Sequence, residues 1–329
     1  MQNVSTHPYD ALTPDVVLDA VDARGFLTDG RLLALNSYEN RVYQVGVENS
    51  VPLVGKFYRP ERWSDAQIIE EHTFGRELDA AEIPVVAPLV LQEKTLFVHA
   101  GFRYALYPRR GGRAPEPGNI DQLEWLGRFI GRIHAVGGVR PFRHRPRLSV
   151  QAMGRDSLAL LEQGEWLPAY VRVNFVDAAI RLLDAVDIAF EGVAPQPLRL
   201  HGDCHPGNIL WTDAGPHFVD LDDCLTGPAI QDIWMLLAGP AHEREQQLRV
   251  FLEGYEQFRL FDPAELALIE PLRALRMIQY MGWLAKRWDD PAFPPAFPWF
   301  GTPRYWEEQV NSLREQLEAL EAPPLKLHS

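Results

Sequence analysis

The sequence predicts an α+β protein of two lobes, a smaller N-terminal lobe over residues 1–108 and a larger C-terminal lobe over residues 109–329. Short apolar runs separated by turns occupy most of the first region and predict an antiparallel sheet with one prominent helix. Apolar residues at helical spacing dominate the second region, which we expect to be mainly helical. A polar loop between short apolar runs, residues 198–223, interrupts this helical pattern and carries the main chemical signal.

Length and charge exclude several classes of protein. The 329 residues suffice for two lobes with large cores. With 45 acidic residues against 32 lysines and arginines, the net charge of −13 argues against binding to nucleic acid or to an anionic membrane surface. No apolar run reaches the roughly 18 residues of a membrane span, and the N-terminus lacks the pattern of a signal peptide. We expect a cytoplasmic protein that acts as a monomer, and its two cysteines, Cys204 and Cys224, match a reducing compartment.

The N-terminal lobe begins with a predicted helix over residues 14–24. Thr13, Pro14 and Asp15 supply an N-cap, a first-turn proline and an acidic first turn. The strands of a five-stranded antiparallel sheet follow at residues 32–35, 42–47, 53–58, 95–98 and 102–107.

The turn between the first two strands, residues 36–41, contains no glycine. In kinases the equivalent turn covers the nucleotide phosphates with a glycine-rich loop. Any phosphate cradle here must therefore use the Ser37 hydroxyl and backbone N–H groups. Taken alone, the turn predicts only a hairpin.

Lys56 lies in the third strand, and the next segment predicts a helix that starts at a capping box of Ser64 and Gln67. In kinases a lysine at this place reaches the nucleotide phosphates and is held by a carboxylate from the next helix. Glu71 is the expected partner, with the adjacent Glu70 as the alternative. A solvated lysine and a solvated glutamate with no shared role are the ordinary alternative for such a pair.

The C-terminal lobe is predicted to contain several core helices. Asn119 caps one that carries apolar residues on one face and ends before Gly137. Others are expected around residues 174–183, 227–234, 262–283 and 305–320. The segment at 291–300, rich in proline and aromatic residues, breaks the helical pattern and is expected to pack on the helices rather than to bind a partner.

The polar loop places Asp203 five residues before Asn208, and a hairpin returns Asp220 beside both. Phosphoryl transfer needs a carboxylate that accepts a proton from the nucleophilic hydroxyl, and oxygen ligands that hold Mg²⁺ on the phosphates. Asp203 and Asp220 are the predicted catalytic residues, with Asp203 as the base. Asn208 and Asp220 are the predicted metal ligands. The spacing is that of a kinase catalytic and metal loop.

Neighbouring carboxylates allow further roles. Asp222 is placed to assist a second metal ion, and Asp232 to brace the catalytic loop by accepting its backbone N–H groups. Turn capping and a contact with the helix dipole are the ordinary alternatives. Zinc binding is another alternative, although its ligands would lie too close together for the usual zinc spacings. Those ligands would be His201, Asp203, Cys204 and His205.

The form HGDxHxxN at residues 201–208 resembles the aminoglycoside phosphotransferase and choline kinase superfamily. Longer strings throughout the chain resemble the bacterial stress response kinase A family. These strings are LNSYENRVYQV at 35–45, KFYRPERW at 56–63, LHGDCHPGNILW at 200–211, FVDLDD at 218–223 and GPAIQDIWMLL at 227–237.

This resemblance implies the choline-kinase-like version of the bilobal kinase fold, with an N-terminal lobe that covers the nucleotide. It implies a cytoplasmic, ATP-dependent serine/threonine protein kinase of the bacterial stress response that phosphorylates protein hydroxyls and itself. By position, Asp203 matches the catalytic aspartate of the family, Asn208 and Asp220 its Mg²⁺ ligands, and Ser37 its ATP-site serine.

Two other functions remain open at this point. The same loop serves small-molecule kinases that act on amino alcohols or aminoglycosides, and the acidic chain would suit a cationic substrate. A pseudokinase that binds nucleotide without transferring phosphate is the second alternative. The presence of the full kinase set speaks against it, namely Lys56, Glu71, Asp203, Asn208 and Asp220.

Overall fold

The computed structural model describes residues 7–327. Their contacts divide the chain into two compact units. The first contains the residues through Glu116 together with Phe142–Arg145 and His205–Cys224, and the second contains Pro117–Pro141, Pro146–Cys204 and the residues from Leu225 onward. The polar loop is therefore shared, since Asp203 groups with the second unit and Asn208 and Asp220 with the first. The predicted boundary between residues 108 and 109 stays a prediction.

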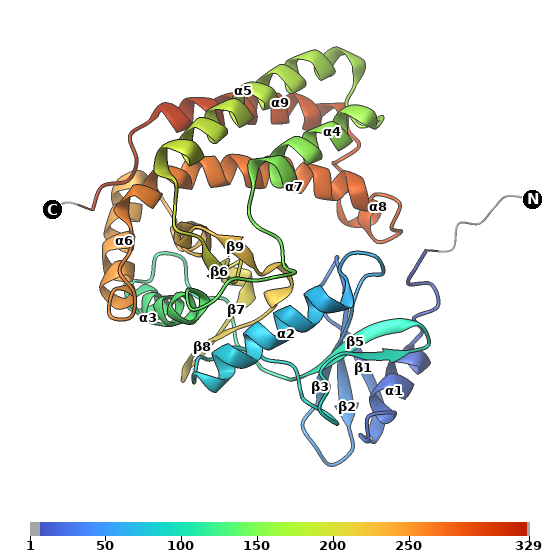
Figure 1. Cartoon of the computed structure of the whole chain (residues 1–329). Helices are drawn as coiled ribbons and strands as arrows, with labels where there is room; N and C mark the ends of the chain where they lie inside the picture. Colours follow the sequence, from blue (N-terminus) through green and yellow to red (C-terminus); the bar gives the residue numbers. More distant parts are fainter. Residues whose placement is uncertain (1–6, 328–329) are drawn as a thin grey trace, which may run out of the picture. The chain divides into compact units, whose positions relative to one another are not determined.

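The first unit is built on a five-stranded antiparallel sheet of order β1-β2-β3-β5-β4 (Figure 1). The strands are β1 (Thr28–Ala34), β2 (Arg41–Val47), β3 (Leu53–Phe57), β4 (Phe97–His99) and β5 (Phe102–Pro108). The predicted sheet is confirmed, although β1 begins four residues earlier than the predicted strand at 32–35. β3 lies in the centre of the sheet, between β2 and β5.

The two faces of this sheet carry different helices. One face packs on α1 (Pro14–Asp22), since Val17 and Val21 share a core with Phe57 of β3 and Tyr104 of β5. Because successive strand residues point to opposite faces, Lys56 lies on the other side from Phe57. Its cross-strand partner Ala105 packs there against Ile68.

Helix α2 (Asp65–Ala80), which carries Ile68, begins at the predicted capping box. The Ser64 hydroxyl accepts a hydrogen bond from the Gln67 backbone N–H at 3.3 Å, and the Gln67 side chain accepts one from the Ser64 N–H at 2.9 Å. The local sequence therefore places Glu70 and Glu71 in the second turn of α2.

A second part of the first unit comes from residues 205–224. It consists of the 3₁₀ turn η2 (Pro206–Asn208), the antiparallel hairpin of β7 (Ile209–Thr212) and β8 (Gly215–Phe218), and the 3₁₀ turn η3 (Leu221–Asp223). Phe218 pairs with Val85 and Trp211 with Arg113, so this hairpin is tied into the N-terminal unit by backbone hydrogen bonds.

The second unit is mainly helical, as predicted, and α5, α7 and α9 pack along one another within it (Figure 1). Its helices are α3 (Ile120–Gly137), α4 (Asp156–Gln163), α5 (Ala169–Val193), α6 (Ala241–Tyr255), α7 (Ile269–Arg287), α8 (Phe293–Ala296) and α9 (Pro303–Glu321). A π-helical turn η1 (Gln151–Arg155) leads into α4, and a small sheet pairs β6 (Leu198–Leu200) with β9 (Leu225–Gly227). Gly127 of α3 lets α6 approach closely, because a Cβ there would lie 2.0 Å from the backbone oxygen of Phe251.

Two predicted helix segments are wrong in their local form. The segment 227–234 forms the 3₁₀ turns η4 (Ala229–Asp232) and η5 (Trp234–Leu236), and residues 263–268 form a further one, η6 (Pro263–Leu268), before α7. The Glu265 carboxylate of η6 accepts the Ile230 backbone N–H of η4 at 2.9 Å. This side-chain hydrogen bond links the two turns and replaces α-helical hydrogen bonding there.

The segment rich in proline and aromatic residues packs as expected, with Phe293 and Phe300 fully buried. Phe300 contacts the rings of Trp166, Trp288 and Trp306 within the second unit. None of the helices formed by residues 7–327 is long and apolar enough to cross a membrane.

Candidate active site

A cavity of about 320 Å³ lies in the first unit and brings together five of the six predicted site residues. Those five are Ser37, Lys56, Glu71, Asn208 and Asp220. Other walls come from the sheet, from α2 and from the β7 hairpin, and they include Leu35, Val42, Val54, Val86, Leu210 and Val219. Apolar walls with a few convergent polar groups are typical of a small-molecule site of this size. The sixth residue, Asp203, belongs to the second unit.

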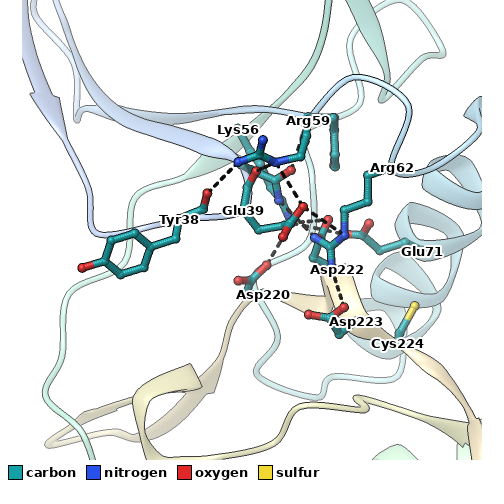
Figure 2. A network of polar contacts seen from close by, with 12 residues as sticks. Tyr38, Glu39, Lys56, Arg59, Arg62, Glu71, Asp220, Asp222, Asp223 and Cys224 are labelled. Atoms are coloured by element: carbon teal, nitrogen blue, oxygen red, sulfur yellow. Dashed lines mark hydrogen bonds and ion pairs between the residues drawn. The ribbon is translucent and has the colours of Figure 1, made fainter. Parts of the chain in front are cut away.

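Lys56 is the central cation of this cavity (Figure 2). Its Nζ lies 2.9 Å from Asp220 Oδ1, 3.0 Å from Asp222 Oδ1 and 3.7 Å from Glu71 Oε1. Burial alone would lower the pKa of Lys56, but the three carboxylates outweigh it and hold the pKa well above its ordinary value. The side chain therefore stays charged although it is only 8% exposed.

Glu70 and Glu71 have separate partners. Glu71 is buried beside Lys56, and burial raises its pKa to about 7 although Lys56 opposes the rise. Glu70 instead accepts three backbone N–H groups, from Arg143 at 2.6 Å and from His144 and Arg145 at 2.7 Å each. Burial raises the pKa of Glu70, but these hydrogen bonds outweigh it and the pKa lies below its ordinary value. Of the two alternatives, only Glu71 lies beside Lys56.

The Asp222 carboxylate is buried and has several charged and polar partners. Its carboxylate pairs with Lys56 and with Arg62, and it accepts a hydrogen bond from the Asn40 amide at 3.1 Å (Figure 2). Burial raises the pKa of Asp222, but Arg62 and Lys56 outweigh it and the pKa lies far below its ordinary value. These partners occupy the Asp222 carboxylate in this structure, and its role with a second metal ion stays a prediction.

Asp220 and Asn208 form the part of the cavity wall that suits a cation. Asp220 has a left-handed backbone with φ of +61°, a conformation costly for a residue with a side chain and frequent at functional sites. Its side chain is 49% exposed and turns toward Lys56. The Val219 N–H donates to the Asn208 carbonyl oxygen at 3.0 Å, which ties the two predicted ligands together through the backbone. An amide oxygen and an open carboxylate fit Mg²⁺, a hard cation that keeps several oxygen ligands from water and phosphate.

The zinc alternative finds no support. Within residues 7–327, no group of three or more His, Cys, Asp or Glu side chains is arranged to hold a metal ion. Burial raises the pKa of the Cys204 thiol well above its ordinary value, and that of Cys224 as well. Without a metal, both thiols are therefore expected to stay protonated and unreactive.

The glycine-free turn at residues 36–41 is held by Arg59, which contacts Tyr38 and Glu39 (Figure 2). The Arg59 guanidinium donates to the backbone oxygens of Glu39 at 2.9 Å and Tyr38 at 3.1 Å, and it pairs with the Glu39 carboxylate at 3.2 Å. The Asn40 side-chain oxygen accepts the Arg59 backbone N–H at 3.1 Å. Our sequence reasoning missed these residues, although two arginines shortly after Lys56 in KFYRPERW were a visible signal.

Asp203 follows β6 in the second unit and is paired with an arginine of α7. Arg276 Nη1 donates to Asp203 Oδ1 at 2.6 Å. Asp232 accepts the backbone N–H groups of His201 and Gly202 at 2.8 Å each, which confirms the predicted brace. Asp232 thus holds the backbone of the two residues that directly precede Asp203.

Three features together define the kinase-like class of phosphotransferases. They are a five-stranded sheet with a buried lysine and glutamate, an adjoining loop with an asparagine and an aspartate on the cavity wall, and a helical second unit. The chain belongs to the phosphotransferase enzyme family, whose model matches residues 31–269, and within it to the group of stress response kinase A. It is therefore a phosphotransferase.

Two relatives show how closely the group is related. The serine/threonine protein kinase RdoA of Salmonella typhimurium strain LT2 is 47% identical over 325 residues, which cover 99% of this chain and 98% of the relative. Stress response kinase A of Escherichia coli strain K12 is 46% identical with the same coverage.

Solved structures of lower identity share the fold. A structure named as an amicoumacin kinase in complex with AMP-PNP, Ca²⁺ and Ami has a TM-score of 0.71 at 19% identity, with 96% of each chain covered. A microcompartment-associated aminopropanol kinase has a TM-score of 0.70 at 16% identity, with 95% of this chain and all of that chain covered. The predicted α+β kinase-like fold is confirmed.

Proposed function

We propose that this protein is an ATP-dependent serine/threonine protein kinase of the bacterial stress response that also phosphorylates itself. The main support is the cavity in which Lys56 meets Glu71, Asp220 and Asp222 beside Ser37 and Asn208. The relatives at 46% and 47% identity, which carry protein kinase and stress response names over their full length, support the acceptor class. The partner is a protein with serine or threonine hydroxyls, and a cytoplasmic monomer stays a prediction.

ATP occupies the cavity with its phosphates beside Lys56 and the Ser37 turn. In this structure, the Lys56 ammonium group contacts three carboxylates. When ATP binds, its phosphates replace the half-exposed Asp220 carboxylate as a partner of this ammonium group. Asp222 and Glu71 then keep the ammonium group in position. Asp220 and Asn208 would hold Mg²⁺, which would neutralise charge on the phosphates.

Asp203 accepts the proton of the acceptor hydroxyl as the γ-phosphoryl group transfers in line. Arg276 fixes the orientation of this carboxylate through the contact at 2.6 Å. Asp232 fixes the backbone just before it through His201 and Gly202.

Kinases of small molecules are the second candidate, since both of the structures compared above carry such names. Those structures are 16% and 19% identical and support the fold alone. The contact between Arg276 and Asp203 does not separate the two candidates, because in both of them the group that meets Asp203 is a neutral hydroxyl.

The test is incubation with radiolabelled ATP and Mg²⁺, with and without a generic protein acceptor, for the wild type and Asp203→Asn. We expect label on serine or threonine in the wild type and a loss of about 10²- to 10⁴-fold in the variant, with nucleotide binding retained. Transfer to choline, aminopropanol or an aminoglycoside but not to protein would replace the proposal with the second candidate. Failure to bind nucleotide would refute both.

A further inference from the structure

Residues 142–145 form a short segment of the first unit whose flanking residues, on both sides, belong to the second unit. Three consecutive backbone N–H groups of this segment, from Arg143, His144 and Arg145, point at the carboxylate of Glu70. The Gln67 side chain donates to the His144 carbonyl oxygen at 3.1 Å, one turn earlier on α2. The segment is therefore fastened to α2 through its backbone, with both carboxylate oxygens of Glu70 as acceptors.

The side chain at the end of this segment reaches the metal loop. The Arg145 guanidinium donates to the backbone oxygens of Asp222 and of Cys224, the latter at 2.9 Å. It is buried at 5% exposure, with its guanidinium carbon 4.1 Å from the centroid of the Trp63 ring. Both carbonyl oxygens belong to the turn that directly follows Asp220, so Arg145 fixes the path of the chain at that aspartate.

These contacts form a continuous connection from Glu70 to the metal loop, beside the pair of Glu71 and Lys56. Two adjacent residues of α2 thus support different parts of the cavity wall. Glu71 contacts Lys56 directly, and Glu70 is connected to the metal loop through Arg145. Only the segment from Leu221 to Cys224 separates Asp220 from β9. The metal loop is short, and Lys56 contacts its first residue, Asp220, while Arg145 contacts its end at Cys224.

We infer that Glu70 and Arg145 are positioning residues that lock the metal loop to α2 and so hold the site for Mg²⁺ and nucleotide in place. This inference rests on the proposed function. It gives a role to a carboxylate and an arginine that contact neither cofactor nor substrate. Partners of this kind behind metal ligands commonly contribute about 10- to 100-fold to metal affinity.

The experiment compares the wild type with Glu70→Gln, Arg145→Met and Arg145→Lys, and uses Arg143→Met as the matched control. The Arg143 side chain is exposed, and Arg143 contacts Glu70 only through its backbone N–H. This control therefore removes a charge from the same segment without removing a contact. The first readout is the Mg²⁺ concentration that half-saturates binding of an ATP analogue. The second is amide hydrogen exchange of residues 220–224 in the nucleotide-free protein.

We expect Glu70→Gln and Arg145→Met to raise the half-saturating Mg²⁺ concentration by about 10- to 100-fold and to speed exchange at residues 220–224. Both values for Arg145→Lys should lie between those of these variants and those of the wild type, because an ammonium group reaches one carbonyl oxygen at a time. Arg145→Lys replaces Arg145→Met in the comparison if Arg145→Met does not fold. Wild-type values for folded Arg145→Lys and Glu70→Gln would overturn the inference, as would equal effects in Arg143→Met.

The proposed function can fail separately from this inference. If the wild type binds nucleotide and transfers phosphate while the variants keep its metal dependence, only the inference fails. If the wild type binds no nucleotide, both fail together.

Discussion

Lys56 lies closer to the carboxylate of Asp222, at 3.0 Å, than to that of Glu71, at 3.7 Å. A kinase lysine is expected to pair with a glutamate from the helix, which here is Glu71 of α2. The nearest buried carboxylate is instead that of Asp222, two residues after Asp220. Asp222 also binds Arg62 and Asn40, so it joins the lysine to the turn that carries Ser37. The two carboxylates should therefore differ in their contribution to stability and to nucleotide binding.

Replacement of Asp222 should be the more damaging of the two. Asp222→Asn leaves Arg62 and Lys56 without their shared buried anion, and breaking such a pair costs about 3–5 kcal/mol of unfolding free energy. Glu71→Gln should cost less, because the pKa of Glu71 is raised to about 7 and its charge is already partly lost at neutral pH. Urea denaturation of both variants checks the order, and equal losses would contradict it.

The pH dependence of stability should carry the signature of Glu71. Its pKa rises from 4.5 in the unfolded chain to about 7 in the fold, mainly through burial. The folded state then binds more protons than the unfolded state between these values, so the contribution of Glu71 to stability falls as pH rises from 4.5 to 7. One pKa unit corresponds to about 1.4 kcal/mol, so the fall is on the order of 3 kcal/mol.

The measurement compares unfolding free energies of the wild type and Glu71→Gln from pH 5 to pH 8. Because glutamine does not titrate, the variant should gain on the wild type as pH rises. Burial lowers the pKa of His72 to about 3, so the histidine contributes stability that is lost as pH falls from 6.5 toward 3 in both proteins. Parallel curves for the two proteins would refute the role given to Glu71.

Arg59→Met should weaken ATP binding through the turn and not through the chemistry. The guanidinium holds the backbone oxygens of Tyr38 and Glu39, next to Ser37. Hydrogen bonds from a charged group contribute about 1.5–3 kcal/mol each, so we expect the KM for ATP to rise about tenfold or more with a smaller change in kcat. Arg31→Met is the control, since Arg31 is 75% exposed and pairs with Asp29 at the sheet edge. A fall in kcat at constant KM would contradict this role.

The parts of this protein that depend on neighbouring residues could be predicted from the sequence. The capping box of α2, the five strands and the kinase spacing of Asp203, Asn208 and Asp220 are all patterns within a few dozen residues. The 3₁₀ form of η4 could not be predicted, because it depends on Glu265, which lies 35 residues beyond its partner Ile230.

The supports of the candidate site were hidden for the same reason. Glu70 lies 73 to 75 residues from the N–H groups that it accepts, and Asn40 lies 182 residues from Asp222. Neither distance leaves a local pattern, and both residues occur in ordinary positions for a helix and a turn. The sequence therefore predicts the candidate groups for binding ATP and metal but not the groups that hold them in place.

Arg276→Met should separate the orientation of the base from nucleotide binding. Arg276 and Asp203 both belong to the second unit, whereas the cavity and its lysine belong to the first. Loss of a charged hydrogen bond at 2.6 Å frees the Asp203 carboxylate to adopt other rotamers, and a loss of about 1.5–3 kcal/mol corresponds to about 10- to 100-fold in kcat. Nucleotide affinity should stay at the wild-type value, and Arg276→Lys should restore part of the rate. Steady-state kinetics with a protein acceptor and calorimetric titration with an ATP analogue make the test. A variant that lost affinity for the analogue and kept its kcat would show that Arg276 serves nucleotide binding instead.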